Sequence, residues 1–302
     1  MKKLGWVGVG AMGFPMVQAL LDHELAVKVY DVNLERIDAL RKMGAEGVDD
    51  LENQPFDDVD VLGIMVQNYA QCRELLLDRR VLDTLQPGAV LMVFSTIGAQ
   101  AIREIEQWAK ARSIAVLDAP VSGGPQRARG HLSIMFSGEA KTVERTRGIL
   151  EVLGGTLIPV GDQVGQGQTV KMINQLLAGV HIAAAAEALT LAQKAGIETQ
   201  LAYDVVIQSA GNSWMFHDRG PRMLSGEYLP ARSALEIFVK DLGIVQDAAR
   251  DLEMPLFLAP AAFQMFLGGR GQGLSQWDDS AVIEVYQRLA GFEKEKTPKG
   301  DG

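Results

Sequence analysis

Cysteine is almost absent from this chain of 302 residues, which contains a single one, Cys72. One cysteine cannot form a disulfide within the chain, so we expect a fold held by its core and a cytoplasmic location. Histidine is also scarce, and none of the four forms a metal-ligand pairing such as HExxH; they are His23, His131, His181 and His217. We therefore expect no metal site.

Positive charge is in deficit, and the net charge of -9 argues against a nucleic-acid partner. No apolar run looks long enough to cross a bilayer, so we expect no membrane partner either. With 47% hydrophobic and 22% charged residues, the composition is typical of a soluble globular protein, and 302 residues are enough for two domains. A small-molecule substrate is the default expectation.

Apolar, β-branched runs alternate with amphipathic segments from residue 3 to about residue 160, the pattern typical of parallel βαβ units. The expected strands have the sequences LGWVGV, AVKVY, VLGIMV, AVLMVF, IAVLD, LSIMFSG and TLIPV. Several are apolar throughout, as expected when helices cover both faces of a sheet. We predict an α/β fold with a doubly wound parallel sheet of the Rossmann type.

The pattern then changes, because residues 168 to 196 form one alanine-rich apolar stretch without strand-like alternation. This predicts a long helix buried on nearly every side. At about 1.5 Å per residue it would run roughly 40 Å, long enough to pass from one domain into another. We predict a Rossmann domain at residues 1–163, an all-α domain at 164–292 joined through this helix, and a disordered charged tail at 293–302.

A glycine-rich turn, VGVGAMG, follows the first predicted strand; its key residues are Gly8, Gly10, Ala11, Met12 and Gly13. A helix follows it, and the next strand ends in Asp31, so the context of a dinucleotide fingerprint is complete. The helix N-terminus supplies amide donors for phosphates. A carboxylate suits the ribose 2′-hydroxyl of NAD and repels the 2′-phosphate of NADP by on the order of 3 kcal/mol per charge, at about 5 Å and a dielectric of about 20. The expected cofactor is NAD, although Arg36 could soften that repulsion.

A dehydrogenase needs a group that moves the substrate proton. The segment GQGQTVKMINQ, residues 165–175, places Lys171 three positions before Asn174, so both share one face at the start of the long helix. Burying a lysine ammonium is costly, and this cost favours the neutral amine that an acid/base catalyst needs near neutral pH. The other interpretation is a lysine whose head reaches water.

A second polar cluster, DAPVSGGP at residues 118–125, directly follows a predicted strand. Ser122 and the backbone amides of Gly123 and Gly124 could bind a small anion, since glycine permits close backbone approach. A plain turn after the strand is the other interpretation.

Four segments in order make the chain resemble the β-hydroxyacid dehydrogenase family over about residues 3 to 290: GWVGVGAMGFPM, DAPVSGGPQRARG, GQTVKMINQ and FVKDLGIV. The resemblance implies a Rossmann domain joined by a long helix to an all-helical domain, with the active site in the cleft between them. It also implies an NAD-dependent oxidoreductase of carbohydrate metabolism that acts on the CH–OH group of a small hydroxy acid, and a homodimer or homotetramer.

The same resemblance implies residue roles. Lys171 would be the catalytic acid/base, and Asn174 would orient the substrate. The substrate would be held by Ser122, Gly123 and Gly124, with Gln175 beside them. The cofactor would contact Gln67, Asn68 and Thr96 on its nicotinamide side, and Lys240 and Asp241 from the helical domain.

The stretch AGNSWMFHDRGPRM, residues 210–223, resembles the threonate dehydrogenase branch of this family. That branch implies a four-carbon sugar acid such as L-threonate, with Trp214 and His217 lining the pocket; a core tryptophan and an exposed histidine are the other interpretation. Dehydrogenation of 3-hydroxyisobutyrate and reduction of tartronate semialdehyde stay open as alternatives. Imine reduction is disfavoured because Lys171 is present, and decarboxylation because the helical half is short. A non-enzymatic cofactor-binding module is disfavoured because the chain keeps that lysine and has no added basic domain.

Overall fold

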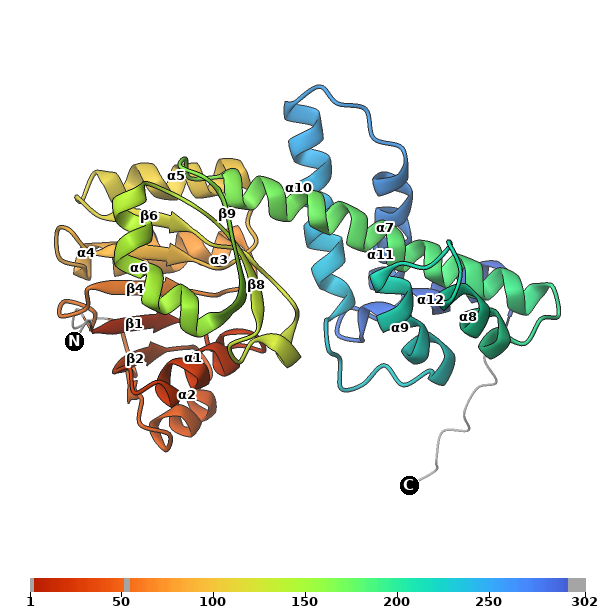
Figure 1. Ribbon diagram of the computed structural model, residues 1–302, viewed down its shortest axis with the longest axis horizontal. Helices are drawn as coiled ribbons and strands as arrows, with labels where there is room; N and C mark the ends of the chain where they lie inside the picture. The colour runs from red at the N-terminus through yellow and green to blue at the C-terminus, as the bar shows by residue number, and fades with distance from the viewer. Residues whose placement is uncertain (1–2, 52–54, 293–302) are drawn as a thin grey trace. The chain divides into compact units, whose positions relative to one another are not determined.

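The computed structural model describes residues 3–51 and 55–292 and divides into two compact units, Met1–Ile173 and Asn174–Gly302 (Figure 1). The division falls inside a helix, so the domain boundary expected at residues 163 and 164 stays a prediction. The predicted disordered tail, residues 293–302, lies outside the described residues.

The first unit is built on one nine-stranded sheet within its described residues. The strands are β1 (Leu4–Val7), β2 (Val27–Tyr30), β3 (Glu46–Gly47), β4 (Val61–Ile64), β5 (Val90–Val93), β6 (Ala115–Asp118), β7 (Val121–Ser122), β8 (Leu132–Ser137) and β9 (Gly154–Gly161). Their order is β3-β2-β1-β4-β5-β6-β8-β7, with β9 paired to β8. Strands β3 to β6 in this order run parallel, while β8 is antiparallel to β6 and β7. The predicted Rossmann sheet is confirmed, and the winding direction reverses between β1 and β4.

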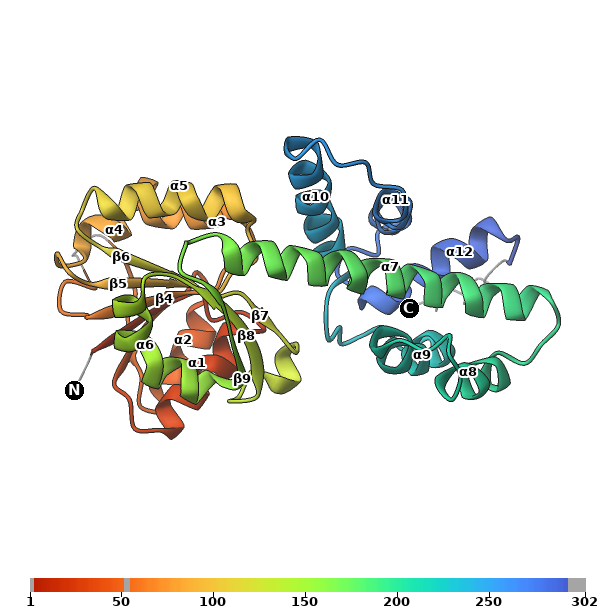
Figure 2. The same cartoon turned by 45° about the horizontal axis from the view of Figure 1, so that its top comes forward.

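Helices cover both faces of the sheet (Figures 1 and 2). One face carries α1 (Gly13–Asp22), α2 (Leu34–Arg41) and α6 (Ala140–Leu153), and the other carries α3 (Tyr69–Arg73) with a π-helical continuation (Glu74–Asp78), α4 (Val81–Thr84) and α5 (Ala99–Lys110). Consecutive strand residues point to opposite cores: Trp6 packs with the first set of helices and Val7 with the second. The central strands β1, β4 and β5 are thus buried on both faces, which explains their continuous apolar sequences.

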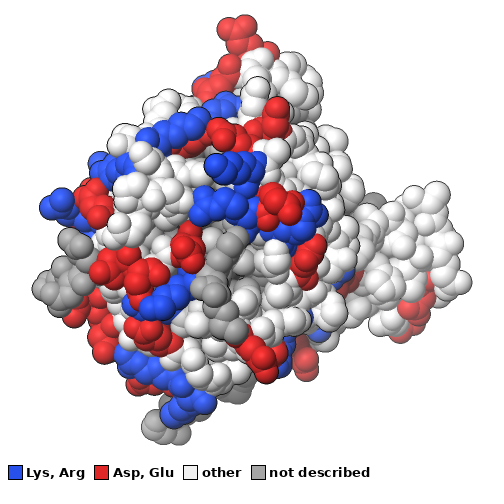
Figure 3. All heavy atoms as spheres, turned by 60° about the vertical axis from the view of Figure 1, so that its left-hand side comes forward, with Lys and Arg blue, Asp and Glu red and all other residues white. Residues whose placement is uncertain are grey.

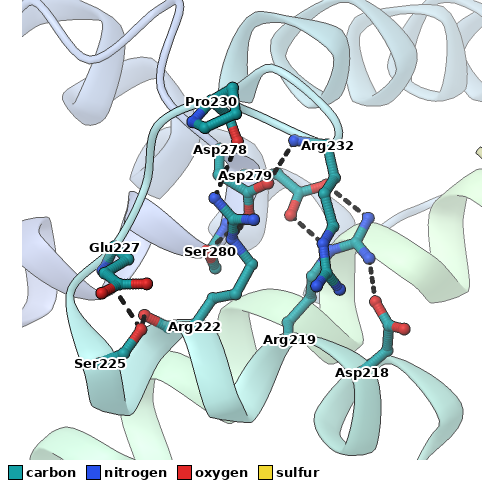
Figure 4. A network of polar contacts seen from close by, with 10 residues as sticks. All are labelled: Asp218, Arg219, Arg222, Ser225, Glu227, Pro230, Arg232, Asp278, Asp279 and Ser280. Atoms are coloured by element: carbon teal, nitrogen blue, oxygen red, sulfur yellow. Dashed lines mark hydrogen bonds and ion pairs between the residues drawn. The ribbon is translucent and has the colours of Figure 1, made fainter. Parts of the chain in front are cut away.

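The second unit is helical in its described residues. It contains most of α7 (Gln166–Lys194), then α8 (Thr199–Ile207), α9 (Trp214–Ser225), α10 (Leu235–Asp251), α11 (Leu258–Gly271), a 3₁₀ turn (Asp279–Val282) and α12 (Ile283–Leu289). Phe238 and Phe266 stack with ring centroids 5.2 Å apart where α10 packs on α11. A polar network fastens α9 to the 3₁₀ turn (Figure 4): Arg219 Nε and Nη2 donate to the two oxygens of the fully buried Asp279, at 2.6 and 3.0 Å.

The long helix α7 confirms one prediction and corrects another. It spans the predicted apolar stretch, but it is not buried on every side, because Ile173, Leu177 and Leu191 are exposed by 53%, 50% and 68%. An alanine-rich helix is apolar all round, and its composition does not say which of its faces the same chain covers. An apolar stripe of α7 is therefore left at the surface.

The expectation that no apolar run reaches the length of a membrane span is also wrong. Among the described residues, α7 is long and apolar enough by length and composition, with half of its most apolar window buried inside the protein. The core helix of a soluble protein meets the same criterion, so the expectation of no membrane partner stays a prediction.

Acidic and basic side chains alternate over the face that Figure 3 presents. Acidic and basic side chains of the first unit also pair: Lys28 Nζ lies 2.7 Å from Asp58 Oδ1, and Arg112 Nε lies 2.6 Å from Asp83 Oδ1. A polyanion requires a continuous basic surface, which this mixed face does not offer. The expected absence of a nucleic-acid partner stays a prediction.

Candidate active site

The predicted site residues of the first unit follow the carboxyl ends of neighbouring strands. Gly8 follows β1, Asp31 follows β2, Gln67 follows β4, Thr96 follows β5, and Ser122 lies shortly after β6. Because these strands are adjacent and parallel, their carboxyl ends lie along one edge of the sheet. Doubly wound sheets bind ligands at this edge, where the strand order reverses.

The glycine turn is shaped for a close approach to a phosphate. A Cβ on Gly8, which has a φ of +90°, would lie 2.3 Å from the Met65 carbonyl oxygen, and a Cβ on Gly13 would lie 2.0 Å from that of Gly8. At Gly10 an added Cβ meets only the end of one side chain, at 3.5 Å, so this side of the turn is open. Helix α1 begins with Met12 as an N-cap that makes no side-chain cap hydrogen bond. The first-turn amides are thus suited to hold a dinucleotide pyrophosphate.

Asp31 is fixed beside this turn. Its Oδ2 accepts a hydrogen bond from Val9 N at 2.6 Å, and its Oδ1 accepts one from Asn33 N at 2.8 Å. Arg36 also reaches the turn, where its Nη1 donates to Val9 O at 3.4 Å, so it is more than an exposed helix residue. The carboxylate places a negative charge next to the glycines, as NAD recognition requires.

The loop after β4 is held by its own side chains. Gln67 N donates to Gln71 Oε1, and Asn68 Oδ1 accepts from Gln71 N, both at 2.9 Å, so the N-cap Asn68 satisfies one amide of α3 and the Gln71 side chain holds the loop before it. Val66 N donates to Ser95 Oγ at 2.8 Å, which ties this loop to the loop after β5. The two loops expected to border the nicotinamide are therefore joined.

The segment predicted to bind an anion forms a tight turn after β7. Ser122 is half-buried and pairs with Ser133 of β8. Gly123 and Gly124 have φ values of +133° and +68°, which residues with a Cβ rarely adopt. The backbone at this turn therefore favours glycine at both positions, and the two glycines directly follow Ser122 in the chain.

Lys171 lies near the start of α7 and is only 6% exposed. One turn earlier, Gln168 is anchored by four hydrogen bonds from its side-chain amide. Its Nε2 donates to Ser95 O and to Asp118 Oδ1, each at 3.0 Å, and its Oε1 accepts from the backbone amides of residues 97 and 98 at 2.9 and 3.1 Å. These bonds attach the start of α7 to the ends of β5 and β6.

Asp118 is the centre of this anchor and is fully buried. Its Oδ2 accepts hydrogen bonds from Gly165 N and Gln168 N at 3.0 Å and from Ser137 Oγ at 3.3 Å. Burial raises the pKa of Asp118 to about 6, although these hydrogen bonds oppose the rise. Asp118, Gln168 and Ser137 are not among the site residues that the sequence predicts. The available signal for Asp118 and Ser137 is a polar residue at the end of a mostly apolar strand, as in IAVLD and LSIMFS.

The second unit gathers four more of the predicted residues. Asn174 Nδ2 donates to Gln175 Oε1 at 2.9 Å, and Gln175 Nε2 donates to Asp241 Oδ2. The other Asp241 oxygen lies 2.7 Å from Lys240 Nζ, and Asp241 is only 3% exposed. These four residues form one polar cluster, held by two hydrogen bonds and one ion pair, that begins three positions after Lys171 on α7.

Trp214 and His217 lie together on the first turn of α9, whose N-cap Ser213 accepts a hydrogen bond from Phe216 N at 3.0 Å. Trp214 is 61% exposed, so its interpretation as a core residue is wrong, and His217 is exposed too. A role for this pair in lining the substrate pocket stays a prediction.

The titratable side chains offer little to a metal ion. Within residues 3–51 and 55–292, no group of three or more His, Cys, Asp or Glu side chains could hold one. Among the histidines, His23 lies at the end of α1, where its Nδ1 is 2.8 Å from Ala19 O. The contacts described so far belong to hydrogen-bonding and acid/base chemistry.

Comparison with known proteins gives the same two halves. Residues 3–161 match the model for the NAD-binding domain of 6-phosphogluconate dehydrogenase, and residues 165–286 match that for NAD binding of NADP-dependent 3-hydroxyisobutyrate dehydrogenase. The L-threonate dehydrogenase of Pectobacterium atrosepticum is 41% identical over 294 residues, 97% of this chain and 96% of that protein.

Solved structures with the same fold include two described as 3-hydroxyisobutyrate dehydrogenases. The one from Salmonella typhimurium has a TM-score of 0.87 and 42% identity, and covers 94% of this chain and 100% of its own. The one from Mycobacterium tuberculosis, with L-serine, has a TM-score of 0.84 and 28% identity, and covers 95% of this chain and 99% of its own. The similarity therefore extends over nearly the whole length of each protein.

Proposed function

This chain belongs to the β-hydroxyacid dehydrogenase family, and from that premise we propose that it oxidises a four-carbon sugar acid such as L-threonate. It is an NAD-dependent oxidoreductase that acts on the CH–OH group of a hydroxy acid. The observation that best supports a catalytic role is the buried Lys171, which follows Gln168 by one turn at the start of α7.

The residues present fit NAD. Bound NAD supplies the acceptor for the hydride that leaves the substrate carbon. The amides of the glycine turn would hold its pyrophosphate, and Asp31 would accept a hydrogen bond from the ribose 2′-hydroxyl. The turn residues with this role are Gly8, Gly10, Ala11, Met12 and Gly13. The nicotinamide side would be bordered by Gln67, Asn68 and Thr96, and Lys240 and Asp241 would complete the cofactor site.

The proton is assigned to Lys171. As a neutral amine its Nζ accepts the proton of the substrate hydroxyl during oxidation, and as an ammonium it returns that proton during reduction. Asn174, one turn further along α7, would orient the substrate. Because its Nδ2 donates to Gln175, its Oδ1 is left as the acceptor for a substrate hydroxyl. Gln175 is in turn held by Asp241.

The substrate carboxylate is assigned to the turn after β7. The Ser122 hydroxyl and the amides of Gly123 and Gly124 are neutral donors that suit one small anion. A three-carbon and a four-carbon hydroxy acid share this carboxylate, so chain length has to be sensed elsewhere. Trp214 and His217, exposed on α9, would contact the additional hydroxyl groups.

The names of the relatives favour two different substrates, since similar identities connect the chain to an L-threonate dehydrogenase and to a structure described as a 3-hydroxyisobutyrate dehydrogenase. Tartronate semialdehyde reduction is a further candidate of the same chemistry. The test is NADH formation with L-threonate, erythronate, 3-hydroxyisobutyrate, glycerate and tartrate. The highest kcat/KM with L-threonate would support the proposal; the highest with 3-hydroxyisobutyrate would replace the substrate. No turnover of any would refute the dehydrogenase and leave a cofactor-binding module.

We also propose that the protein is a cytoplasmic homodimer or homotetramer of carbohydrate metabolism. The apolar stripe of α7 supports self-association, because exposing side chains such as Leu177 and Leu191 to water is unfavourable. A second copy of this chain is the occupant that we propose for this face, since most soluble oligomers are symmetric assemblies of identical chains. A scarcity of cysteine and a net charge of -9 support a cytoplasmic protein without a nucleic-acid partner.

A further inference from the structure

We propose that Asp118 and Gln168 are positioning residues for the reaction, which together fix the start of α7 and thereby hold Lys171 in register with the loop after β5. This inference rests on the proposed role of Lys171 as the acid/base. Neither residue is assigned contact with substrate or cofactor; each acts through the groups that it holds.

The hydrogen bonds between Asp118 and Gln168 allow only one orientation of the Gln168 side-chain amide. A carboxylate only accepts, so Asp118 Oδ1 requires the Nε2 end of the Gln168 amide to face it. The same Nε2 donates to the carbonyl of Ser95, and Oε1 then faces the two backbone amides of residues 97 and 98. Backbone donors and acceptors cannot be exchanged, so reversal of the Gln168 amide would oppose like groups at each contact.

The anchor acts on Lys171 through helix geometry. Gly167 N donates to Ser137 Oγ at 3.0 Å, and a Cβ on Gly167 would lie 2.9 Å from both Asp118 Oδ2 and the Met135 carbonyl oxygen. The first turn of α7 is therefore in direct contact with the sheet. Lys171 follows Gly167 by four residues and so lies on the same helix face. A shift of this turn would displace the lysine amine.

The anchor also reaches the nicotinamide side. Thr96 lies between two residues that are hydrogen-bonded to the Gln168 side chain. The carbonyl of Ser95 accepts from Gln168 Nε2, and the backbone amide of residue 97 donates to Gln168 Oε1. Ser95 Oγ in turn accepts from Val66 N, next to Gln67. One side chain of α7 thus joins both loops expected around the nicotinamide to the helix that carries the acid/base.

Burying the ionised carboxylate of Asp118 lowers the stability of the fold. An aspartate at this position therefore suggests a functional role. Asp118 is fully buried, and the groups packed against its oxygens from α7, β8 and the segment before α7 are neutral: Gln168, Ser137 and Gly165. Desolvation without a cationic partner is why its pKa is raised to about 6. Since the folded protein holds a proton there that the unfolded chain has released, the contribution of Asp118 to stability falls as the pH rises from about 4 to about 6.

The test compares Asp118→Asn, Gln168→Glu and the double variant in NAD-dependent oxidation of L-threonate by the full chain. In Asp118→Asn the new side-chain N–H group faces the N–H group of Gln168 Nε2, so two donors oppose each other. In Gln168→Glu a carboxylate oxygen replaces Nε2 and faces two further acceptors, Asp118 Oδ1 and the Ser95 carbonyl. The double variant restores the donor–acceptor pair between positions 118 and 168 and leaves only the Ser95 carbonyl unmatched. We expect each single change to lower kcat by about 10- to 100-fold with little change in the KM for NAD, and the double variant to recover most of that loss.

The pH profile separates positioning from general stability. For the wild type, kcat should rise as the pH passes through about 6, while the stability contribution of Asp118 falls; Asp118→Asn should abolish both dependences. Ser137→Ala, a milder change that removes one donor to the carboxylate, should move the rise in kcat to higher pH. A structural role alone would move thermal stability and kcat together.

The inference is overturned if both single variants keep the wild-type kcat and its acid limb, or if the double variant is no better than the singles, while Lys171→Ala is inactive. An active Lys171→Ala, or a wild type that oxidises no hydroxy acid, would instead refute the proposed function, and this inference with it. The two failures are thus distinguished by the lysine variant and the substrate panel.

Discussion

Asp118 accepts hydrogen bonds from both the backbone amide and the side-chain amide of Gln168, each at 3.0 Å. The two residues lie 50 positions apart in sequence, and their contact joins the end of β6 to the first turn of α7. Two segments that the sequence shows separately, DAPVSGGP and GQGQTVKMINQ, therefore belong to one buried arrangement. In the first unit, the segment that carries Ser122 and the helix that carries Lys171 are therefore joined by direct hydrogen bonds.

The cofactor preference should depend on Asp31. Asp31→Ala removes the carboxylate that is held beside the glycine turn by Val9 N and Asn33 N. We expect the ratio of kcat/KM with NAD to that with NADP to fall by about a hundredfold, the equivalent of about 3 kcal/mol of charge repulsion. Glu35→Ala, an exposed acidic residue of the next helix, is the control and should leave the ratio within about twofold. An unchanged ratio in Asp31→Ala would remove this residue from the ribose contact.

The glycine turn should not tolerate a methyl group. In Gly13→Ala the new Cβ would lie 2.0 Å from the Gly8 carbonyl oxygen, so the turn must open and NADH binding should weaken by at least about tenfold. Gly148→Ala is a matched control in α6, where an added Cβ meets nothing within 4 Å. It should stabilise the protein by about 0.5–1 kcal/mol without changing the Kd for NADH. Fluorescence titration with NADH checks both, and equal affinities would contradict the assignment.

Much of the first unit is predictable because its strands are buried on both faces, which leaves continuous apolar runs such as VLGIMV around β4. The two-residue strands β3 and β7 escape prediction, since two residues carry no periodicity. The sequence also indicates the turn of Gly8 and the position of Lys171. It does not indicate that Asp118 contacts Gln168, because a hydrogen bond between distant segments leaves no local pattern. The exposed side of α7 was missed for a similar reason: alanine is compatible with both burial and exposure.

The buried ion pair of the second unit should be important for stability. Asp279 is 0% exposed and accepts hydrogen bonds from both Arg219 Nε and Nη2, so Asp279→Ala would remove the bidentate partner of a buried guanidinium. The charges of Asp218 and Asp278 would remain near Arg219, but its bidentate partner would be lost, and we expect the free energy of unfolding to fall by about 3–5 kcal/mol. The exposed pair Arg147 and Glu144 provides the control, and Arg147→Ala should cost less than about 1 kcal/mol. Urea denaturation measures both, and a similar small loss in each would show that the buried pair is dispensable.

Self-association should depend on the apolar stripe of α7. Leu177→Lys and Leu191→Lys place charges on side chains that are 50% and 68% exposed in the single chain, so neither change should unfold the monomer. If a second copy covers this face, both variants should weaken association, because burying an unpaired ammonium is unfavourable. Light scattering after gel filtration gives the masses. A monomeric wild type, or variants that associate as the wild type does, would refute the interface.

The central claim is that Lys171 carries the proton of the reaction. Its most direct test is kcat of Lys171→Ala for NAD-dependent oxidation of L-threonate, beside Lys141→Ala, an exposed lysine of α6. We expect Lys171→Ala to lose at least about a hundredfold in kcat while it still binds NADH, and Lys141→Ala to match the wild type. A Lys171→Ala enzyme with wild-type kcat would contradict the account.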